Sequence, residues 1–133
     1  MESSRIQELL GSKYVGETEI RQLMIDGARE LRQFCMSCYG PAGRAKVIRA
    51  NSFGDYVTIT KSSQQLFCMD RIELTNPIAK LIIDMAKGQI QELGDGGLFT
   101  LIHASSLLLW AMESNISRAA LSAGLGRAQA WAA

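Results

Sequence analysis

The chain has 133 residues, of which 47% are hydrophobic and 20% are charged, and its formal net charge is +1. These proportions are typical of one folded domain, and they exclude the low hydrophobicity and high net charge of a disordered chain. A net charge so close to zero gives no field that would attract nucleic acid or anionic lipid, so we expect no nucleic-acid partner.

The sequence carries no signal for export or for insertion into a membrane. Its first ten residues lack the basic region and the apolar run of a secretory signal. The most apolar stretch, residues 98–112, is shorter than the ~18 to 20 residues that span a bilayer. Three cysteines are too few, and odd in number, for a secreted disulfide framework. We therefore expect a cytoplasmic protein with reduced thiols and no membrane span.

The sequence pattern of the N-terminal third predicts helices. Capping-box spacing at the start favours a short helix over residues 4–10. Farther along, apolar residues recur three and four positions apart, which predicts a long amphipathic helix over residues 20–38. Gly40 and Pro41 should end it, because glycine favours a left-handed turn and proline cannot continue the backbone hydrogen bonding.

The middle of the chain changes to a β pattern. Residues 47–60 are rich in β-branched and aromatic side chains, and the turn-forming residues 52–55 divide them into two runs, which predicts a β-hairpin. A polar loop, residues 61–63, follows the hairpin. The short apolar run at 66–69 has no clear period, and its secondary structure stays unassigned.

Asn76 and Pro77 mark the start of another helix, because asparagine is a favoured N-cap acceptor and the missing N–H of proline is not needed in a first helical turn. Glycines at 94–97 should end this helix, and residues 98–113 then predict a buried helix whose apolar circumference exceeds what so short a chain readily covers. The alanine-rich segment 118–133 supports only a weak helix or a frayed tail. The predicted class is mainly α with a small β-hairpin. The expected apolar face of the helix after Pro77 comprises Ile78, Leu81, Ile82, Met85, Ala86 and Leu93.

Two glycine loops, residues 40–43 and 94–97, are candidate phosphate-binding elements. Both adjoin helices, so that bare backbone and helix N-terminal donors can approach an anion. Alone, each loop is more typical of a structural helix connection. The order of motifs is more specific: helix, Gly-Pro-x-Gly, hairpin ending in Thr-x-Thr, Asn-Pro helix, Gly-Asp-Gly and apolar helix.

This succession resembles the N-terminal equatorial segment of group II chaperonins over residues 19–113. The resemblance implies a partial equatorial-domain-like fold, divided into an N-terminal extension (1–18), an incomplete equatorial segment (19–116) and a divergent Ala/Gly-rich tail (117–133). It also implies a site for ATP with magnesium, in which Asp95 lies near the metal. The residues that match the nucleotide loops of the family are Gly40, Pro41 and Gly43 in the first loop and Gly94, Asp95 and Gly96 in the third.

The chain also departs from the family pattern at this implied site. Lys61-Ser62-Ser63 replace an Asn-Asp-Gly sequence, and Gly97 and Leu98 replace two threonines. Losing a carboxylate and hydroxyls removes ligands from a phosphoryl-transfer transition state that is stabilised by positioning and charge. We therefore expect weak binding of ATP and magnesium, no hydrolysis, and a protein that is not an enzyme. The alternative is an ATP-binding chaperonin subunit that hydrolyses slowly within a ring.

Residues 37–44 and 97–100 are similar to the McKusick-Kaufman/Bardet-Biedl branch of chaperonin-like proteins. That branch is associated with the centrosome and with assembly of the ciliary complex called the BBSome. The resemblance implies a fragment or short form that assists protein folding or complex assembly at the centrosome or basal body. The implied partners are chaperonin subunits and BBSome-type proteins, and exposed apolar faces would favour self-association.

Other chemistries are weaker alternatives. Cys35 and Cys38 have C-x-x-C spacing, and Cys68 with His103 would complete a zinc set. However, the first two thiols continue a helix face, where small buried hydrophobes are usual, so we expect no zinc. His103 lies in an apolar helix and is expected to be a core histidine. Asp95 has an alternative role as the cap of the next helix, and this alternative stays open.

Overall fold

The computed structural model describes residues 15–49, 57–67 and 74–133. It is mainly α with one antiparallel two-stranded hairpin, which confirms the predicted class. The predicted helix over 4–10, the turn at 52–55 and Cys68 lie outside the described residues. The elements are α2 (Glu17–Cys38), β1 (Lys46–Arg49), β2 (Val57–Thr60), α3 (Ser63–Phe67), α4 (Pro77–Leu93), α5 (Gly97–Glu113) and α6 (Arg118–Ala132).

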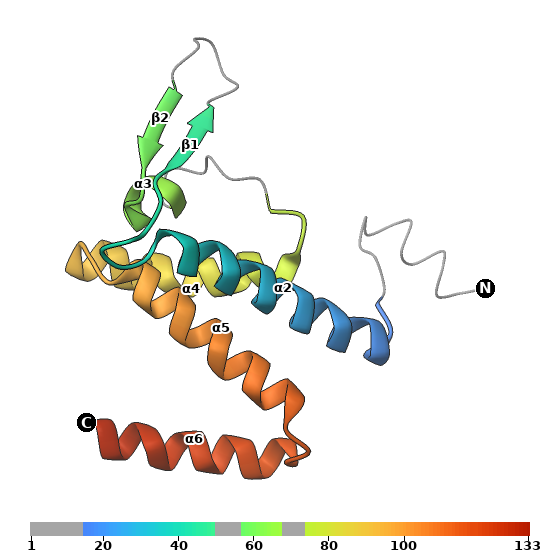
Figure 1. Cartoon of the computed structure of the whole chain (residues 1–133). Coiled ribbons are helices and arrows are strands. Elements are labelled where there is room, and N and C mark those ends of the chain that lie inside the picture. Colours follow the sequence, from blue (N-terminus) through green and yellow to red (C-terminus); the bar gives the residue numbers. More distant parts are fainter. Residues whose placement is uncertain (1–14, 50–56, 68–73) are drawn as a thin grey trace, which may run out of the picture.

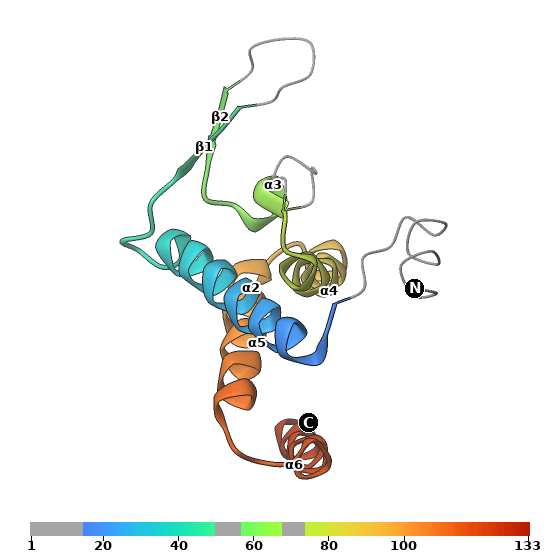
Figure 2. The same cartoon turned by 90° about the vertical axis from the view of Figure 1, so that its right-hand side faces the viewer.

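Three long helices build the core. α2 packs along α5, and α4 packs on both of them, as Figures 1 and 2 show from two sides. The short helix α3 joins this core next to α4, and the hairpin extends away from it beside α3. The hairpin pairs Val47 with Ile59 and Ile48 with Thr58. Its inner face adds Ile48 and Thr60 to the buried residues.

The predicted helix that ends before Gly40 is α2. Its buried side chains include Ala28, Leu31, Cys35 and Cys38, which confirms the predicted apolar face at these positions, whereas Ile20 at its start is 43% exposed. The helix ends where expected, because Gly40 takes a left-handed φ of 82°.

The buried face of α4 differs from the predicted one. Leu81 and Met85 are each 60% exposed, and Leu93 is exposed as well, so the prediction is wrong at these three positions. The helix is apolar on more than one side, and contact with α2 and α5 buries the side that carries two alanines and three isoleucines. Small side chains let helix backbones approach closely, which improves packing density. The buried residues of α4 are Ala79, Ile82, Ile83, Ala86 and Ile90.

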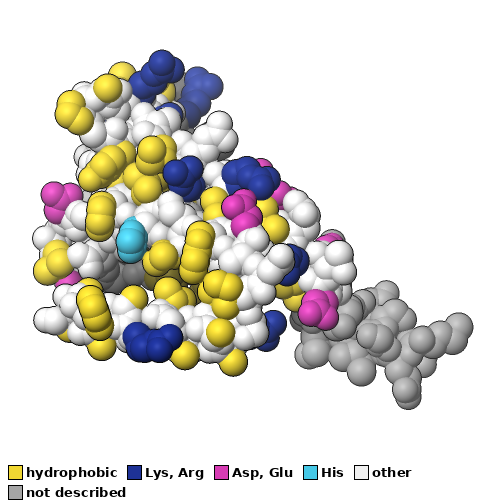
Figure 3. All heavy atoms as spheres, turned by 60° about the horizontal axis from the view of Figure 1, so that its bottom comes forward, with side chains coloured by type: hydrophobic (Ala, Val, Ile, Leu, Met, Phe, Trp, Pro, Cys, Tyr) yellow, Lys and Arg dark blue, Asp and Glu magenta, His cyan; other side chains and the backbone are white. Residues whose placement is uncertain are grey.

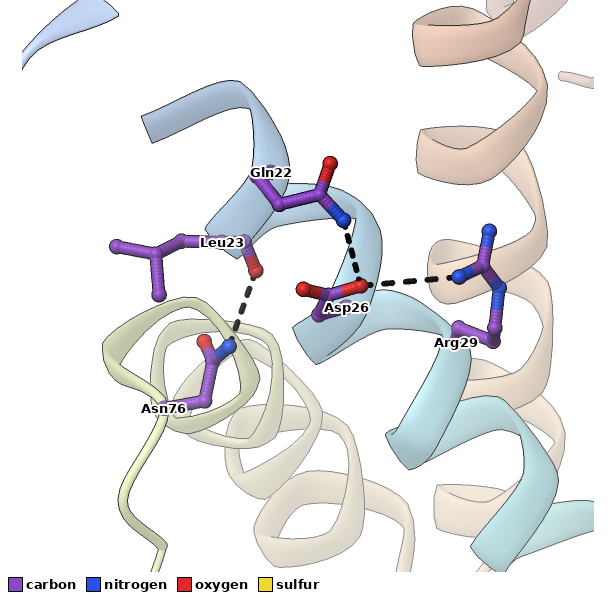
Figure 4. A network of polar contacts seen from close by, with 5 residues as sticks. All are labelled: Gln22, Leu23, Asp26, Arg29 and Asn76. Carbon is purple, nitrogen blue, oxygen red and sulfur yellow. Dashed lines mark hydrogen bonds and ion pairs between the residues drawn. The ribbon is translucent and has the colours of Figure 1, made fainter. Parts of the chain in front are cut away.

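Asn76 both caps α4 and ties it to α2 (Figure 4). Its Oδ1 accepts hydrogen bonds from the backbone N–H groups of Ile78 at 2.9 Å and Ala79 at 3.3 Å. Its Nδ2 donates to the carbonyl of Leu23, in the middle of α2, at 3.0 Å. Gly27 makes this approach feasible, because a Cβ on residue 27 would lie 2.6 Å from the Asn76 Oδ1.

Replacing Asn76 with alanine is expected to lower the free energy of unfolding by about 2 to 3 kcal/mol, because it removes an N-cap and a bond between helices. The matched variant Asn76→Ser keeps a capping oxygen but is too short to reach Leu23, so about half of that loss should remain. Urea denaturation of both variants measures the difference. Equal stabilities of the two variants would show that the cap contributes nothing.

α5 is buried on one side only. Leu101 and Ser105 are fully buried, and the Ser105 hydroxyl donates to the Leu101 carbonyl at 2.6 Å. Phe99 and Trp110 are 58% and 54% exposed, which confirms the expectation that part of the apolar circumference stays uncovered. The prediction of a core histidine is wrong, because His103 lies on the exposed side and stacks on the Phe99 ring with centroids 5.8 Å apart.

α6 is a complete helix rather than a frayed tail. The Ser117 side chain caps it by accepting from the Ala120 N–H at 3.3 Å. None of its residues is buried, and it lies apart from the core layer in Figures 1 and 2. Within residues 15–49, 57–67 and 74–133, none of the helices is long and apolar enough to cross a membrane.

Candidate functional site

The loop after the hairpin and the loop before α5 meet at one pocket of about 270 Å³. The lining residues are Tyr39, Lys61, Ser62, Ser63, Gly94, Asp95, Gly96, Leu98 and Phe99. The structure therefore brings together the predicted site residues Gly94, Asp95 and Gly96. It does not place Gly40, Pro41 and Gly43 in this lining, although their neighbour Tyr39 belongs to it.

The first glycine loop folds back onto the C-terminal end of α2. The Gly43 N–H donates to the Gly40 carbonyl at 3.0 Å, and the Arg44 N–H donates to the Ser37 carbonyl at 2.8 Å. A Cβ on Gly43 would lie only 2.0 Å from the Cys38 carbonyl oxygen. Glycine is thus required here by close backbone approach, and the loop holds Tyr39 at the pocket.

The loop before α5 is built from two left-handed glycines. Gly94 and Gly96 have φ angles of 73° and 82°, which residues other than glycine rarely adopt. The Asp95 Oδ1 accepts from the Gly96 N–H at 2.7 Å. Gly96 itself is the N-cap of α5, and no side chain caps this helix. The alternative role of Asp95 as the cap of α5 is therefore wrong.

The N-terminus of α5 reaches the pocket with free donors. The first-turn N–H groups of an α-helix have no carbonyl partner within the helix, and here no side chain replaces one. Leu98 and Phe99 belong to that first turn and also line the pocket. This end of the helix carries a partial positive charge that favours an anion.

The loop after the hairpin contributes Lys61, Ser62 and Ser63. The Ser62 N–H donates to the Thr60 Oγ1 at 3.0 Å, which shapes the loop. Ser63 begins α3 and is 7% exposed. Its Oγ would lie 2.6 Å from a Cβ on Gly97, so this loop and the start of α5 are in close contact.

Sequence reasoning recorded Lys61, Ser62 and Ser63 only as departures from a family pattern and missed them as lining residues. The signal that could have found these residues is their place directly after a hairpin that ends in Thr-x-Thr, where the resemblance implies a nucleotide loop.

The described lining residues of the pocket carry one charge of each sign. These are Lys61 and Asp95, and neither forms an ion pair with another described residue. Magnesium prefers octahedral coordination by oxygen, and it usually takes carboxylates together with phosphate oxygens and water. One carboxylate with an oxygen already bonded to Gly96 does not fit a magnesium ion held by the protein. Such an ion would take most of its ligands from a bound nucleotide.

The two thiols of the C-x-x-C motif lie in the core. Burial, and to a lesser degree the neighbouring Cys38, raise the pKa of Cys35 to about 12. Cys35 therefore stays protonated at neutral pH, whereas zinc and electrophiles require the thiolate. Over the described ranges, no three metal-ligating side chains gather into a group. These observations agree with a packing role for Cys35 and Cys38.

Comparisons with known proteins match the part of the sequence that contains both glycine loops. The sequence model of the TCP-1/cpn60 chaperonin family matches residues 31–132. A thermosome subunit beta of Aeropyrum pernix is 36% identical over 84 residues, which are 63% of this chain and 15% of that protein. The molecular chaperone MKKS of Homo sapiens is 36% identical over 78 residues, which are 59% of this chain and 13% of that protein.

A third relative covers more of the chain. A thermosome subunit beta of Sulfurisphaera tokodaii is 33% identical over 103 residues, which are 77% of this chain and 18% of that protein. The chain belongs to the TCP-1/cpn60 chaperonin family. Its similarity to thermosome subunits and to MKKS identifies the group II branch of that family. The chain spans less than a fifth of the length of these relatives.

Proposed function

We propose that this chain is a noncatalytic chaperonin-like module that assists protein folding and the assembly of protein complexes. The observation that carries the proposal is the pocket of a chaperonin-family chain in which, among the described lining residues, Asp95 is the only carboxylate and Lys61 the only cation. By resemblance to the cilium-associated branch, the complexes include the BBSome, and the location is the cytoplasm with the centrosome or basal body.

The charge of the pocket argues against turnover. Phosphoryl transfer depends on metal ions and positioned groups that neutralise the charge developing on the transferred phosphate. With Asp95 as the one carboxylate among the described lining residues, the pocket holds a metal poorly, and those residues offer no second carboxylate to activate water. Nucleotide binding through backbone N–H groups tolerates the loss of metal-binding side chains better than catalysis does. Binding requires no stabilisation of the charge that develops in a transition state. The site is therefore a degenerate ATP site that binds without hydrolysing.

The assembly role is supported by the exposed side of α5. Phe99, Leu107 and Trp110 are exposed on it, and Figure 3 shows hydrophobic side chains gathered on the face of the molecule over α5 and α6. Burying one large apolar side chain contributes on the order of 1.5 to 3 kcal/mol, so covering this face would stabilise a complex considerably. We infer that the face binds chaperonin subunits or a second copy of this chain.

Leu107→Glu is expected to weaken the association of the chain with chaperonin subunits about tenfold, because a charge would have to be buried against the partner. Sedimentation of labelled chain with purified chaperonin subunits, without nucleotide, measures this, and BBSome proteins form a second arm. Gln91→Glu adds the same charge at an exposed position of α4 and serves as the control. A wild-type chain that stays a compact monomer, binds neither partner and takes up no hydrophobic dye would sink the proposal.

The second candidate function is an ATP-binding chaperonin subunit that hydrolyses slowly in a ring. It is favoured by Asp95 and by the two left-handed glycines around it, which keep the form of a phosphate loop. Phosphate release from magnesium-ATP separates the two functions. A noncatalytic module is expected to release no phosphate above background, even when chaperonin subunits are present. A slowly hydrolysing subunit is expected to release phosphate, and Asp95→Asn should abolish that release.

A further inference from the structure

A cleft of about 390 Å³ lies where the start of α2 meets the corner between α5 and α6. Its described lining residues are Glu17, Thr18, Ile20, Arg21, Met24, Met112 and Arg118. The Arg21 guanidinium donates to the Met112 carbonyl at 2.5 Å, which ties the start of α2 to the end of α5 and holds two walls of the cleft together. None of these residues lines the pocket before α5, so the two sites are separate.

The cleft suits a large apolar side chain that has a charged neighbour. Ile20, Met24 and Met112 line it, and methionine adapts its shape to a partner and makes favourable contacts with aromatic rings. The carboxylate of Glu17 and the guanidinium of Arg118 also line it, and neither forms an ion pair with another described residue. An arginine is attracted to the face of an aromatic ring, and a carboxylate is attracted to a cation.

The helix α6 carries side chains that match this cleft. Trp131 is 94% exposed, and none of the residues of α6 is buried. Arg127 lies four residues before Trp131 on the same side of the helix, and it forms no ion pair within the described part of the chain. Ala120 and Gly124 continue this side toward the start of α6. One half of the side therefore carries small residues, and the other half carries large ones.

We propose that two copies of the chain pair through α6, with Trp131 of each copy seated in the cleft of the other. An antiparallel pair of α6 helices places the large half of each helix over the small half of its partner, where small residues let the backbones approach. Arg118 follows at the beginning of α6, in the wall of the cleft. The indole ring contacts the two methionines, and Arg127 of one copy meets Glu17 of the other. This contact is the same on both sides, so it closes at two copies.

A single copy cannot fill its own cleft with these side chains. Arg118 and Trp131 lie at opposite ends of α6, and the 13 residues of helix between them span about 20 Å. The inference goes beyond the proposed function, because it concerns α6 and the cleft rather than the exposed side of α5, and because it needs no chaperonin partner.

Sedimentation equilibrium of the full chain over a range of concentrations measures the dissociation constant of the dimer. The wild-type chain is expected to dimerise. Trp131→Ala should weaken the dimer at least about a hundredfold, because a tryptophan anchor is lost at both symmetric contacts. Leu125→Ala removes an exposed apolar side chain from another side of α6, and it should leave the dissociation constant within about twofold of wild type.

A charge reversal tests the ion pair between the two copies. Glu17→Lys and Arg127→Glu should each weaken the dimer about tenfold, because each places like charges opposite one another. The double variant restores opposite charges at both contacts, so its dissociation constant should return to within about threefold of wild type. Glu92→Lys makes the same change as Glu17→Lys at an exposed position of α4 outside the cleft, and it should have no effect.

Three results would each overturn the inference: a wild-type chain that is monomeric at every concentration, a Trp131→Ala dimer as stable as wild type, or a double charge variant that dimerises no better than the single ones. Circular dichroism shows whether each variant keeps its helices, and if Trp131→Ala loses them, the charge reversal decides. Association with chaperonin subunits is measured on the same samples. If the wild-type chain associates with those subunits but never dimerises, the inference fails and the proposed function stands.

Discussion

Gly43→Ala is expected to lower the free energy of unfolding by about 3 kcal/mol, which is the upper end of the cost of overpacking. The new Cβ would lie 2.0 Å from the Cys38 carbonyl oxygen, and this neighbour is backbone that cannot rotate away. Relief requires the first glycine loop to move, which would break the hydrogen bonds of Gly43 and Arg44 to the preceding turn. Tyr39 would then shift at the edge of the pocket.

The matched control for this substitution is Gly88→Ala. Gly88 lies inside α4, and nothing lies within 4 Å of a Cβ added there. Alanine is favoured over glycine in a helix interior by up to about 1 kcal/mol, so the control should be more stable than wild type. Urea denaturation of both variants gives the two free energies. A loss of only a few tenths of a kcal/mol in Gly43→Ala would contradict the tight geometry of the first loop.

Gly97→Thr, which introduces a residue that the family carries, is expected to destabilise this chain by about 2 to 3 kcal/mol. A Cβ on residue 97 would lie 2.5 Å from the Ile90 side chain and 2.6 Å from the Ser63 Oγ. The Ile90 atoms in this contact are at the end of its side chain, which can move to a limited extent. Both side chains are buried, so neither has much room to move away.

A double-mutant cycle with Ser63→Gly tests this explanation. Removing the hydroxymethyl group should recover about 1 kcal/mol of the loss, which is within the usual range of coupling between residues in contact. The remaining loss reflects the contact with Ile90. Strictly additive free energies in the cycle would show that residues 63 and 97 do not compete for the same space.

This coupling bears on how the site departs from the family pattern. By the resemblance, serine stands at 63 in place of a glycine and glycine stands at 97 in place of a threonine, so the larger residue would lie on the other side of one contact. If the cycle shows coupling, the two differences form one rearrangement of packing rather than two separate losses. Restoring either residue alone should damage the pocket.

Local chemistry in the sequence determined where the elements begin and end. Gly40 and Pro41 ended α2, Asn76 and Pro77 began α4, and Gly94 ended α4, each at the expected place. These signals act through the residue itself, because a left-handed φ, a missing N–H or a capping oxygen needs no distant partner. The order of these signals was also specific enough to indicate the chaperonin family.

Only the tertiary structure decided which apolar side chains are buried. α4 could turn either of two apolar sides inward, and contact with α2 and α5 buried the side with Ala79 and Ala86 while Leu81 and Met85 stayed exposed. His103 lies in an apolar sequence, yet α5 has neighbours on one side only, so its other side faces outward. Ser63 became part of the pocket because α3 and α5 meet beside Gly97. Periodicity fixes how residues group on a helix, whereas burial depends on the neighbours that packing supplies.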